Sequence, residues 1–154
     1  MFSSVGMTKS VELFFFFGIS NSTTFKSRLA SDIRPLITSV SRILTVDTQP
    51  ITAVNLAFSG SGLSVLGIDP TTLNMDVFNT GQWADLDALG DSGAKWIPAF
   101  AGTSIHGLFI LQSDTIDHVK DELSSIKSAF GDSITELYQL QGAARPGDQA
   151  GHER

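Results

Sequence analysis

Cysteine is absent from the 154-residue sequence. The chain therefore has no disulfides, no thiolate-bound metal, no zinc ribbon and no cysteine nucleophile. This absence does not fix the compartment, because many secreted proteins also lack cysteine. The length is that of about one domain. A domain of this size buries about two-thirds of its unfolded surface, so it needs no covalent cross-link to fold.

Positive charge is also scarce. Ten Lys and Arg residues stand against 16 Asp and Glu residues, and the net charge is -6. No Lys or Arg lies between Ile43 and Ala94, and the aspartates of that stretch supply the whole excess: Asp47, Asp69, Asp76, Asp85, Asp87 and Asp91. Nucleic acids and anionic membranes are bound through basic surfaces. We therefore expect neither as a partner.

Long hydrophobic runs are missing. The run from Leu13 to Phe17 is short and follows Glu12. A secretory signal needs a basic start and a longer apolar stretch, and a membrane-spanning helix needs about 20 apolar residues. The sequence therefore predicts no signal peptide within this chain and no membrane segment, and it leaves the compartment open.

Four segments have the residue pattern of β-strands: Val11–Ser20, Ile51–Phe58, Ile105–Gln112 and Ile134–Leu140. The first and third are apolar on both faces, which is typical of central strands that are covered on both sides. We expect these two strands in the middle of the sheet.

Two helices are predicted between these strands. Asn21 or Ser22 is placed to cap a helix whose apolar stripe is Phe25, Leu29 and Ile33. Pro35 should kink or restart it, with a second helical piece over Leu36–Leu44. After a cap at Ser113 or Asp114, the spacing predicts a long amphipathic helix up to Phe130, with Gly131 as its left-handed stop.

The order strand, helix, strand, strand, helix, strand is that of the split βαβ or ferredoxin-like arrangement. The expected fold class is α+β, with a four-stranded antiparallel sheet and the helices on one face. Residues 1–10 are expected to be an N-terminal extension, 11–141 the domain, and 142–154 a tail. The predicted core comprises Phe15, Phe17, Phe25, Leu29, Leu56, Phe58, Phe109, Leu111, Val119, Leu123, Ile126 and Phe130.

Residues 60–100 form a long insertion that is poor in periodicity and rich in Gly, Asp, Thr and Asn. Short helices are expected over Leu63–Leu66 and Gln82–Leu89. Loops of this length are usually functional or act as a lid.

Local motifs for chemistry are weak. The glycine-rich stretch from Ser59 to Gly67 follows a strand and precedes a helix, but Val65 stands where a dinucleotide loop has its third Gly or Ala. A plain strand-to-helix turn is the favoured interpretation.

His118 and Glu122 are spaced to hold a metal from one helix, but no third ligand accompanies them, and a solvated acidic face explains them better. His106 is interpreted as a core histidine with its hydrogen bonds satisfied. No serine nucleophile elbow occurs.

Several stretches together resemble the dye-decolorizing (DyP-type) haem peroxidases, particularly those of fungi. They cover nearly the whole chain: Glu12-Leu-Phe-Phe-Phe-Phe-Gly-Ile, Val54-Asn-Leu-Ala-Phe-Ser, Gly81-Gln-Trp-Ala-Asp, Ala88-Leu-Gly-Asp, Trp96-Ile-Pro-Ala-Phe, Ile105-His-Gly-Leu-Phe and Ala144-Arg-Pro-Gly-Asp-Gln-Ala-Gly-His-Glu. The last of these is the most specific.

The resemblance implies the N-terminal ferredoxin-like domain of a much longer peroxidase that oxidises dyes and aromatic compounds with hydrogen peroxide. In the family, haem b is held mainly by a second domain, which supplies the proximal His and the distal Arg. Gly151, His152 and Glu153 match the approach to the loop that carries the catalytic Asp, which would lie beyond Arg154. The resemblance therefore assigns no catalytic, cofactor-binding or metal residue to this chain.

Two functional hypotheses remain open. In the first, the chain is a part of a DyP-type peroxidase that is inactive alone and does not bind haem alone; the substrates of the whole protein are peroxide and small aromatic molecules. In the second, it is a free-standing ferredoxin-like domain. It would pair its sheet with that of a second copy in a dimeric α+β barrel, and either bind a small apolar ligand or act as a small non-haem enzyme.

Overall fold

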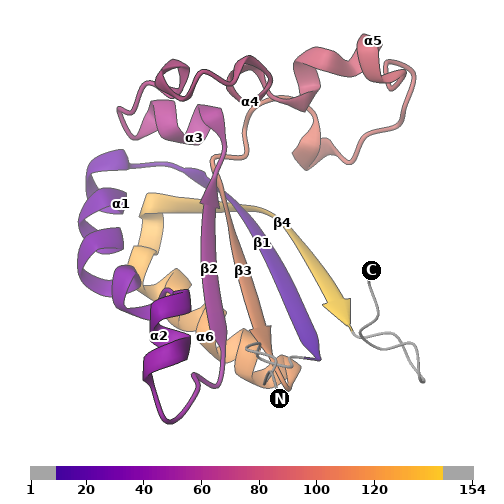
Figure 1. Cartoon of the computed structure of the whole chain (residues 1–154). Coiled ribbons are helices and arrows are strands. Elements are labelled where there is room, and N and C mark those ends of the chain that lie inside the picture. The colour runs from indigo at the N-terminus through magenta and orange to yellow at the C-terminus, as the bar shows by residue number, and fades with distance from the viewer. Residues whose placement is uncertain (1–9, 144–154) are drawn as a thin grey trace.

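The computed structural model describes residues 10–143, which build one four-stranded antiparallel sheet with helices on one of its faces (Figure 1). The strands are β1 (Val11–Ile19), β2 (Ala53–Phe58), β3 (Gly107–Ser113) and β4 (Ile134–Ala143), and their order is β2-β3-β1-β4. Every neighbouring pair is antiparallel. The predicted fold class and the central position of β1 and β3 are confirmed.

Helices α1 (Ser22–Arg28) and α6 (Ile116–Phe130) cover one face of this sheet. The Asn21 side chain caps α1 by accepting a hydrogen bond from the Thr24 N–H at 3.0 Å. Helix α6 is capped by Thr115, whose hydroxyl accepts from the His118 N–H at 3.3 Å, so the predicted cap at Ser113 or Asp114 is wrong. Gly131 ends α6 at a φ of 53°, the positive value that favours glycine.

The core lies between the helices and the sheet. Phe25 of α1 stacks on Phe130 of α6 with 4.6 Å between ring centroids, and Phe17 of β1 stacks on both Phe25 and Phe109. Nine of the predicted core residues are buried: Phe15, Phe17, Phe25, Phe109, Leu111, Val119, Leu123, Ile126 and Phe130. The other three, Leu29, Leu56 and Phe58, are partly buried against this cluster.

Pro35 lies in the last helical turn after α1, and a second helical piece follows it, as predicted. Helix α1 continues as a π-helical turn (Leu29–Ile33) and a 3₁₀ turn (Arg34–Leu36). A short helix, α2 (Val40–Thr45), follows after Ser39, which caps it. The expected helix over Leu36–Leu44 is thus displaced toward the C-terminus, because the Ser39 cap sets its start.

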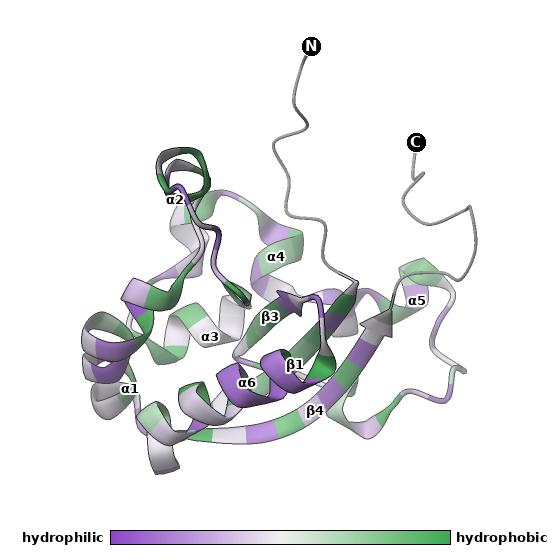
Figure 2. Ribbon diagram, turned by 90° about the horizontal axis from the view of Figure 1, so that it is seen from below, coloured by the Kyte–Doolittle hydropathy of each residue, from purple (hydrophilic) through white to green (hydrophobic). Residues whose placement is uncertain are grey.

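The opposite face of the sheet, which we call the open face, is covered by no α-helix within residues 10–143 and is contacted by the 3₁₀ turn Pro98–Phe100 through the Phe100 ring (Figure 1). It carries partly buried or exposed apolar side chains from three strands: Phe14, Phe16, Leu108, Ile110, Tyr138 and Leu140. Figure 2 shows β1 and β3 as predominantly hydrophobic, beside an α6 that carries many hydrophilic residues. The expectation that β1 is covered on both sides is therefore wrong for the described part of the chain.

The insertion lies at the end of the sheet where β2 stops and β3 begins (Figure 1). It contains α3 (Gly60–Val65), α4 (Asp76–Thr80) and α5 (Leu86–Leu89), and 3₁₀ turns at Pro70–Leu73, Gln82–Asp85 and Pro98–Phe100. The helix predicted over Leu63–Leu66 starts earlier, at Gly60, and the one over Gln82–Leu89 is a 3₁₀ turn followed by α5. Helix α4 was not predicted. Among the described residues, no helix has the length and apolar character to cross a membrane.

Candidate functional site

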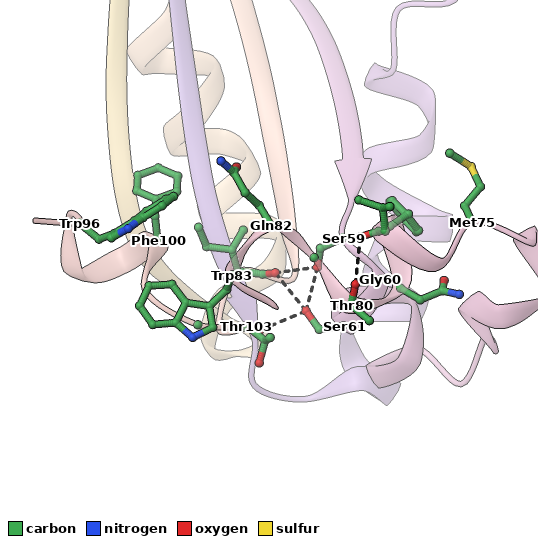
Figure 3. A pocket seen from close by; sticks show the side chains of 16 residues that line it. Ser59, Gly60, Ser61, Met75, Thr80, Gln82, Trp83, Trp96, Phe100 and Thr103 are labelled. Atoms are coloured by element: carbon green, nitrogen blue, oxygen red, sulfur yellow. Dashed lines mark hydrogen bonds between the residues drawn. The ribbon is translucent and has the colours of Figure 1, made fainter. Parts of the chain in front are cut away.

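A cavity of about 510 Å³ lies within the insertion, between α3, α4 and the segment that leads into β3 (Figure 3). We call it the tryptophan cavity. Its lining residues come almost wholly from the insertion: Ser59, Gly60, Ser61, Met75, Val77, Phe78, Asn79, Thr80, Gly81, Gln82, Trp83, Trp96, Phe100, Gly102, Thr103 and Ile105. This volume is within the range of ligand pockets, about 300–1,000 Å³.

Both tryptophans of the chain line this cavity. Trp83 and Trp96 meet edge to face with 5.8 Å between ring centroids, and the Trp96 Nε1–H donates to the Asp91 carbonyl at 3.4 Å. Phe100 also contacts Phe16 and Tyr138 on the open face, at centroid distances of 5.0 and 5.3 Å. The aromatic wall of the cavity is therefore continuous with the open face of the sheet.

The hydroxyl groups of the cavity wall donate to backbone carbonyls (Figure 3). Ser59 Oγ donates to the Ile105 carbonyl at 2.6 Å and accepts from the Gly62 N–H at 3.0 Å. Ser61 Oγ donates to the Thr103 carbonyl at 3.0 Å, and Thr80 Oγ1 donates to a carbonyl within α4 at 3.1 Å. A hydroxyl has one proton to donate and two lone pairs. Ser61 Oγ also lies 2.9 Å from Ser59 Oγ, and either oxygen can be the donor, so the hydroxyls of Ser61 and Thr80 each keep at least one lone pair for a ligand.

The two glycines of α3 have structural roles. A Cβ at Gly62 would overlap the His106 carbonyl oxygen and lie 2.7 Å from its carbonyl carbon. A Cβ at Gly60 would lie 2.7 Å from the Phe78 carbonyl oxygen of α4. Close backbone contact, together with the Ser59 cap of a six-residue helix, explains this glycine-rich stretch. This supports the strand-to-helix turn over a phosphate loop.

Charged side chains are missing from the cavity lining within residues 10–143. The insertion around it carries five aspartates, Asp69, Asp76, Asp85, Asp87 and Asp91, against the single base Lys95. Asn79 Oδ1, at the wall, is buried and has no hydrogen-bond partner among the described residues. The site is therefore aromatic, uncharged and set in a negative electrostatic field.

Comparison with known proteins assigns the chain to a family. Residues 4–146 match the family described as the DyP dimeric alpha+beta barrel domain. The chain belongs to the dye-decolorizing peroxidase family. A crystal structure of a DyP from Auricularia auricula-judae superposes with a TM-score of 0.87 at 47% sequence identity, over 97% of this chain and 34% of that one.

Fungal relatives agree along the chain but are much longer. Peroxidase 2 of Mycetinis scorodonius is 57% identical over 97% of this chain, which spans 29% of the relative. The dye-decolorizing peroxidase of Mycena epipterygia is 55% identical over 97% of this chain, which spans 28% of it. This DyP chain thus spans less than a third of the length of these relatives.

The histidines of this DyP domain are not gathered into one site within the described residues. His106 stands just before β3, partly buried, and its Nδ1 accepts the Ile19 N–H at 2.8 Å, as expected for a satisfied histidine. Burial lowers its pKa below the ordinary value. His118 is exposed on α6, and burial raises the pKa of its neighbour Glu122. In the same part of the chain, no group of three or more His, Asp or Glu could hold a metal.

The family's haem does not fit the tryptophan cavity. Haem iron is bound by His, Cys, Met or Tyr side chains. The cavity lining holds one such residue, Met75, and neither described histidine is part of it. Gly151, His152 and Glu153, the predicted approach to the family's active-site loop, lie outside the described residues. That assignment stays a prediction.

Sequence reasoning missed the tryptophan cavity of this DyP domain. The length of the insertion indicated a functional segment, but the separation between Trp83 and Trp96 follows neither helix nor strand periodicity. The signal that was present is compositional, because both tryptophans of the chain lie inside the insertion. Their meeting depends on turns at Gly81 and Gly90, where φ is 74° and 76°.

Proposed function

We propose that residues 11–141 are the N-terminal ferredoxin-like domain of a haem peroxidase that oxidises dyes and other aromatic compounds with hydrogen peroxide. This proposal rests on one observation: the chain is highly similar in sequence to peroxidases that are much longer than the chain itself. Relatives described as peroxidases are 55–57% identical over 97% of this chain, which spans only 28–29% of their length. Residues 142–154 then lead from this domain toward the rest of the longer protein.

We infer that residues 1–154 alone are not a competent peroxidase and do not bind haem alone. The reaction needs an iron ligand and an acid–base group within hydrogen-bond reach of the peroxide. In the family the acid follows the segment that Gly151, His152 and Glu153 match, and the ligand and distal cation belong to the second domain. Among the described histidines, His106 is held by Ile19 and His118 is exposed on α6.

The structural contribution of the domain is its open face. Apolar side chains such as Phe14, Ile110 and Leu140 leave a sheet face that contact with a second sheet would stabilise. The family description as a dimeric alpha+beta barrel supports such sheet pairing. For the isolated chain, we propose that the partner sheet comes from a second copy, in a homodimer.

Haem reconstitution tests the proposal. Hemin is added to the purified 154-residue chain and to a longer protein that continues through the length of the relatives. The longer protein should develop a Soret band and oxidise a dye with peroxide, and the short chain should do neither. Dye turnover by the short chain that is lost in His106→Ala but kept in His118→Ala would overturn the inference that the chain is inactive alone. A longer protein with no Soret band would overturn the peroxidase proposal itself.

A further inference from the structure

We propose that the tryptophan cavity binds an aromatic molecule that carries no negative charge. This site is separate from the proposed haem chemistry. It rests on the geometry of the insertion alone.

The shape and the walls of the cavity favour an aromatic ligand. The space of about 510 Å³ is bordered by the rings of Phe78, Trp83, Trp96 and Phe100. Aromatic rings that stack or meet edge to face gain binding energy beyond the burial of their area. Trp83 is still 39% exposed, and Met75 and Val77 are 59% and 69% exposed, so a ligand here would cover apolar surface that the fold leaves in water. An aliphatic ligand would gain burial but not ring contacts.

The polar part of the wall offers both acceptors and donors. Ser61 and Thr80 donate to backbone carbonyls and retain lone pairs. The Gln82 amide, the Trp83 indole N–H and the Thr103 hydroxyl also line the cavity and can donate. A ligand that donates a hydrogen bond and a ligand that accepts one therefore both find partners here.

The charge of the insertion excludes anionic ligands. Among the described residues no Lys, Arg or His lines the cavity, and the insertion that builds most of it carries five aspartates against one lysine. Burying an anion without a positive partner is costly. A sulfonated or carboxylated aromatic molecule should therefore bind much more weakly than an uncharged one of the same shape.

Nuclear magnetic resonance of the ¹⁵N-labelled chain tests this inference. Trp83 and Trp96 are the only tryptophans, so they give two indole N–H signals, which Trp83→Phe and Trp96→Phe assign. The probes are 2-naphthol, its methyl ether 2-methoxynaphthalene, and naphthalene-2-sulfonate. We expect 2-naphthol to shift both signals saturably. The ether should bind within about threefold of 2-naphthol, because the wall offers donors as well as acceptors, and the sulfonate should bind at least about tenfold more weakly than either.

A matched pair of variants on α3 locates the binding. Ser61 lines the cavity, whereas Ser64, on the same helix, does not. Ser61→Leu should fill the cavity and weaken 2-naphthol at least about tenfold, and Ser64→Leu should leave its affinity within about twofold. Equal affinity of both variants would overturn the assignment of the site.

If Ser61→Leu fails to fold, the three probes still test the proposal on the unmodified chain. Unshifted indole signals with 2-naphthol, or shifts by the sulfonate at equal concentration, would overturn the ligand class. The measurement uses neither haem nor peroxide, so its failure would leave the peroxidase proposal standing.

Discussion

The two faces of the sheet carry similar side chains but have different surroundings. On the covered face, Phe15, Phe17 and Phe109 are fully buried against α1 and α6. On the open face, Phe14 and Phe16 alternate with them along the same strand and remain partly exposed. A strand that is apolar on both faces therefore indicates that both faces are buried in the complete protein. It does not indicate whether the residues that bury the second face belong to the same domain. This difference is consistent with a chain that is part of a longer protein.

Truncation of neighbouring residues on β3 gives the largest contrast. Phe109 points into the core and is 0% exposed, whereas Leu108, beside it, belongs to the open face. Phe109→Ala should lower the free energy of unfolding by about 3–5 kcal/mol through the cavity it leaves. Leu108→Ala should cost about 1 kcal/mol or less. Urea unfolding measures both, and equal losses would mean that the open face is packed as tightly as the core.

A second comparison sets two glycines of the insertion against each other: Gly62, which packs against His106, and Gly93, which has open space around it. Gly62→Ala forces a Cβ into the backbone of His106, so α3 must move away from the sheet. The expected loss is about 1–3 kcal/mol, as for other overpacked sites. Nothing lies within 4 Å of a Cβ at Gly93, and Gly93→Ala should stay within about 0.5 kcal/mol. Similar stability of the two variants in thermal unfolding would contradict the close contact between α3 and His106.

Sequence patterns predicted the sheet and the core because periodicity reports burial. The alternation through Phe15 and Phe17, and the stripe from Val119 to Phe130, each define one buried face. The residue that caps the start of α6 was harder to predict, because Ser113, Asp114 and Thr115 all have side chains that can cap a helix. In the structure, the backbone places the Thr115 hydroxyl where it accepts the His118 N–H, so Thr115 is the cap.

The candidate site was much less predictable than the fold. The tryptophan cavity is built from short helices and turns, whose positions are set by contacts distant in sequence, such as Ser59 with Ile105. Such contacts leave no periodic pattern. The functional assignment came from family motifs, and the family's active-site approach at residues 151–153 lies outside the described part of the chain.

The junction of β1 with the insertion should respond to pH through His106. Its unprotonated Nδ1 accepts the Ile19 N–H, and burial lowers its pKa. The unfolded chain therefore takes up a proton before the folded one. The stability from this contact is present above about pH 6.5, the ordinary pKa of histidine, and is lost as the pH falls through the folded pKa.

The check is urea unfolding between pH 7 and pH 5. The loss attributable to His106 should be well below about 1.4 kcal/mol per pH unit, the slope for one whole proton, because the ring is only partly buried. His106→Asn keeps an acceptor near Ile19 but does not titrate, so it should be less sensitive to pH than the parent chain. His118→Gln, at an exposed position, should follow the parent. A steeper dependence in His106→Asn would contradict this account.

The smallest effect on folding is expected at Leu140, and it separates the two faces most directly. Leu140 lies on the open face and is 50% exposed. Leu140→Lys should change the free energy of unfolding of the monomer by no more than about 0.5 kcal/mol, provided that the measurement is made at a concentration where copies do not associate.

The same substitution should weaken the proposed homodimer, because it places a charge in each of two apolar sheets that must meet. Sedimentation at increasing concentration measures the dimer, with Lys127→Met on α6 as a control outside the open face. If Leu140→Lys leaves the dimer affinity unchanged, the open face is not the dimer interface. A large loss of monomer stability would instead show that this face is already covered within the chain.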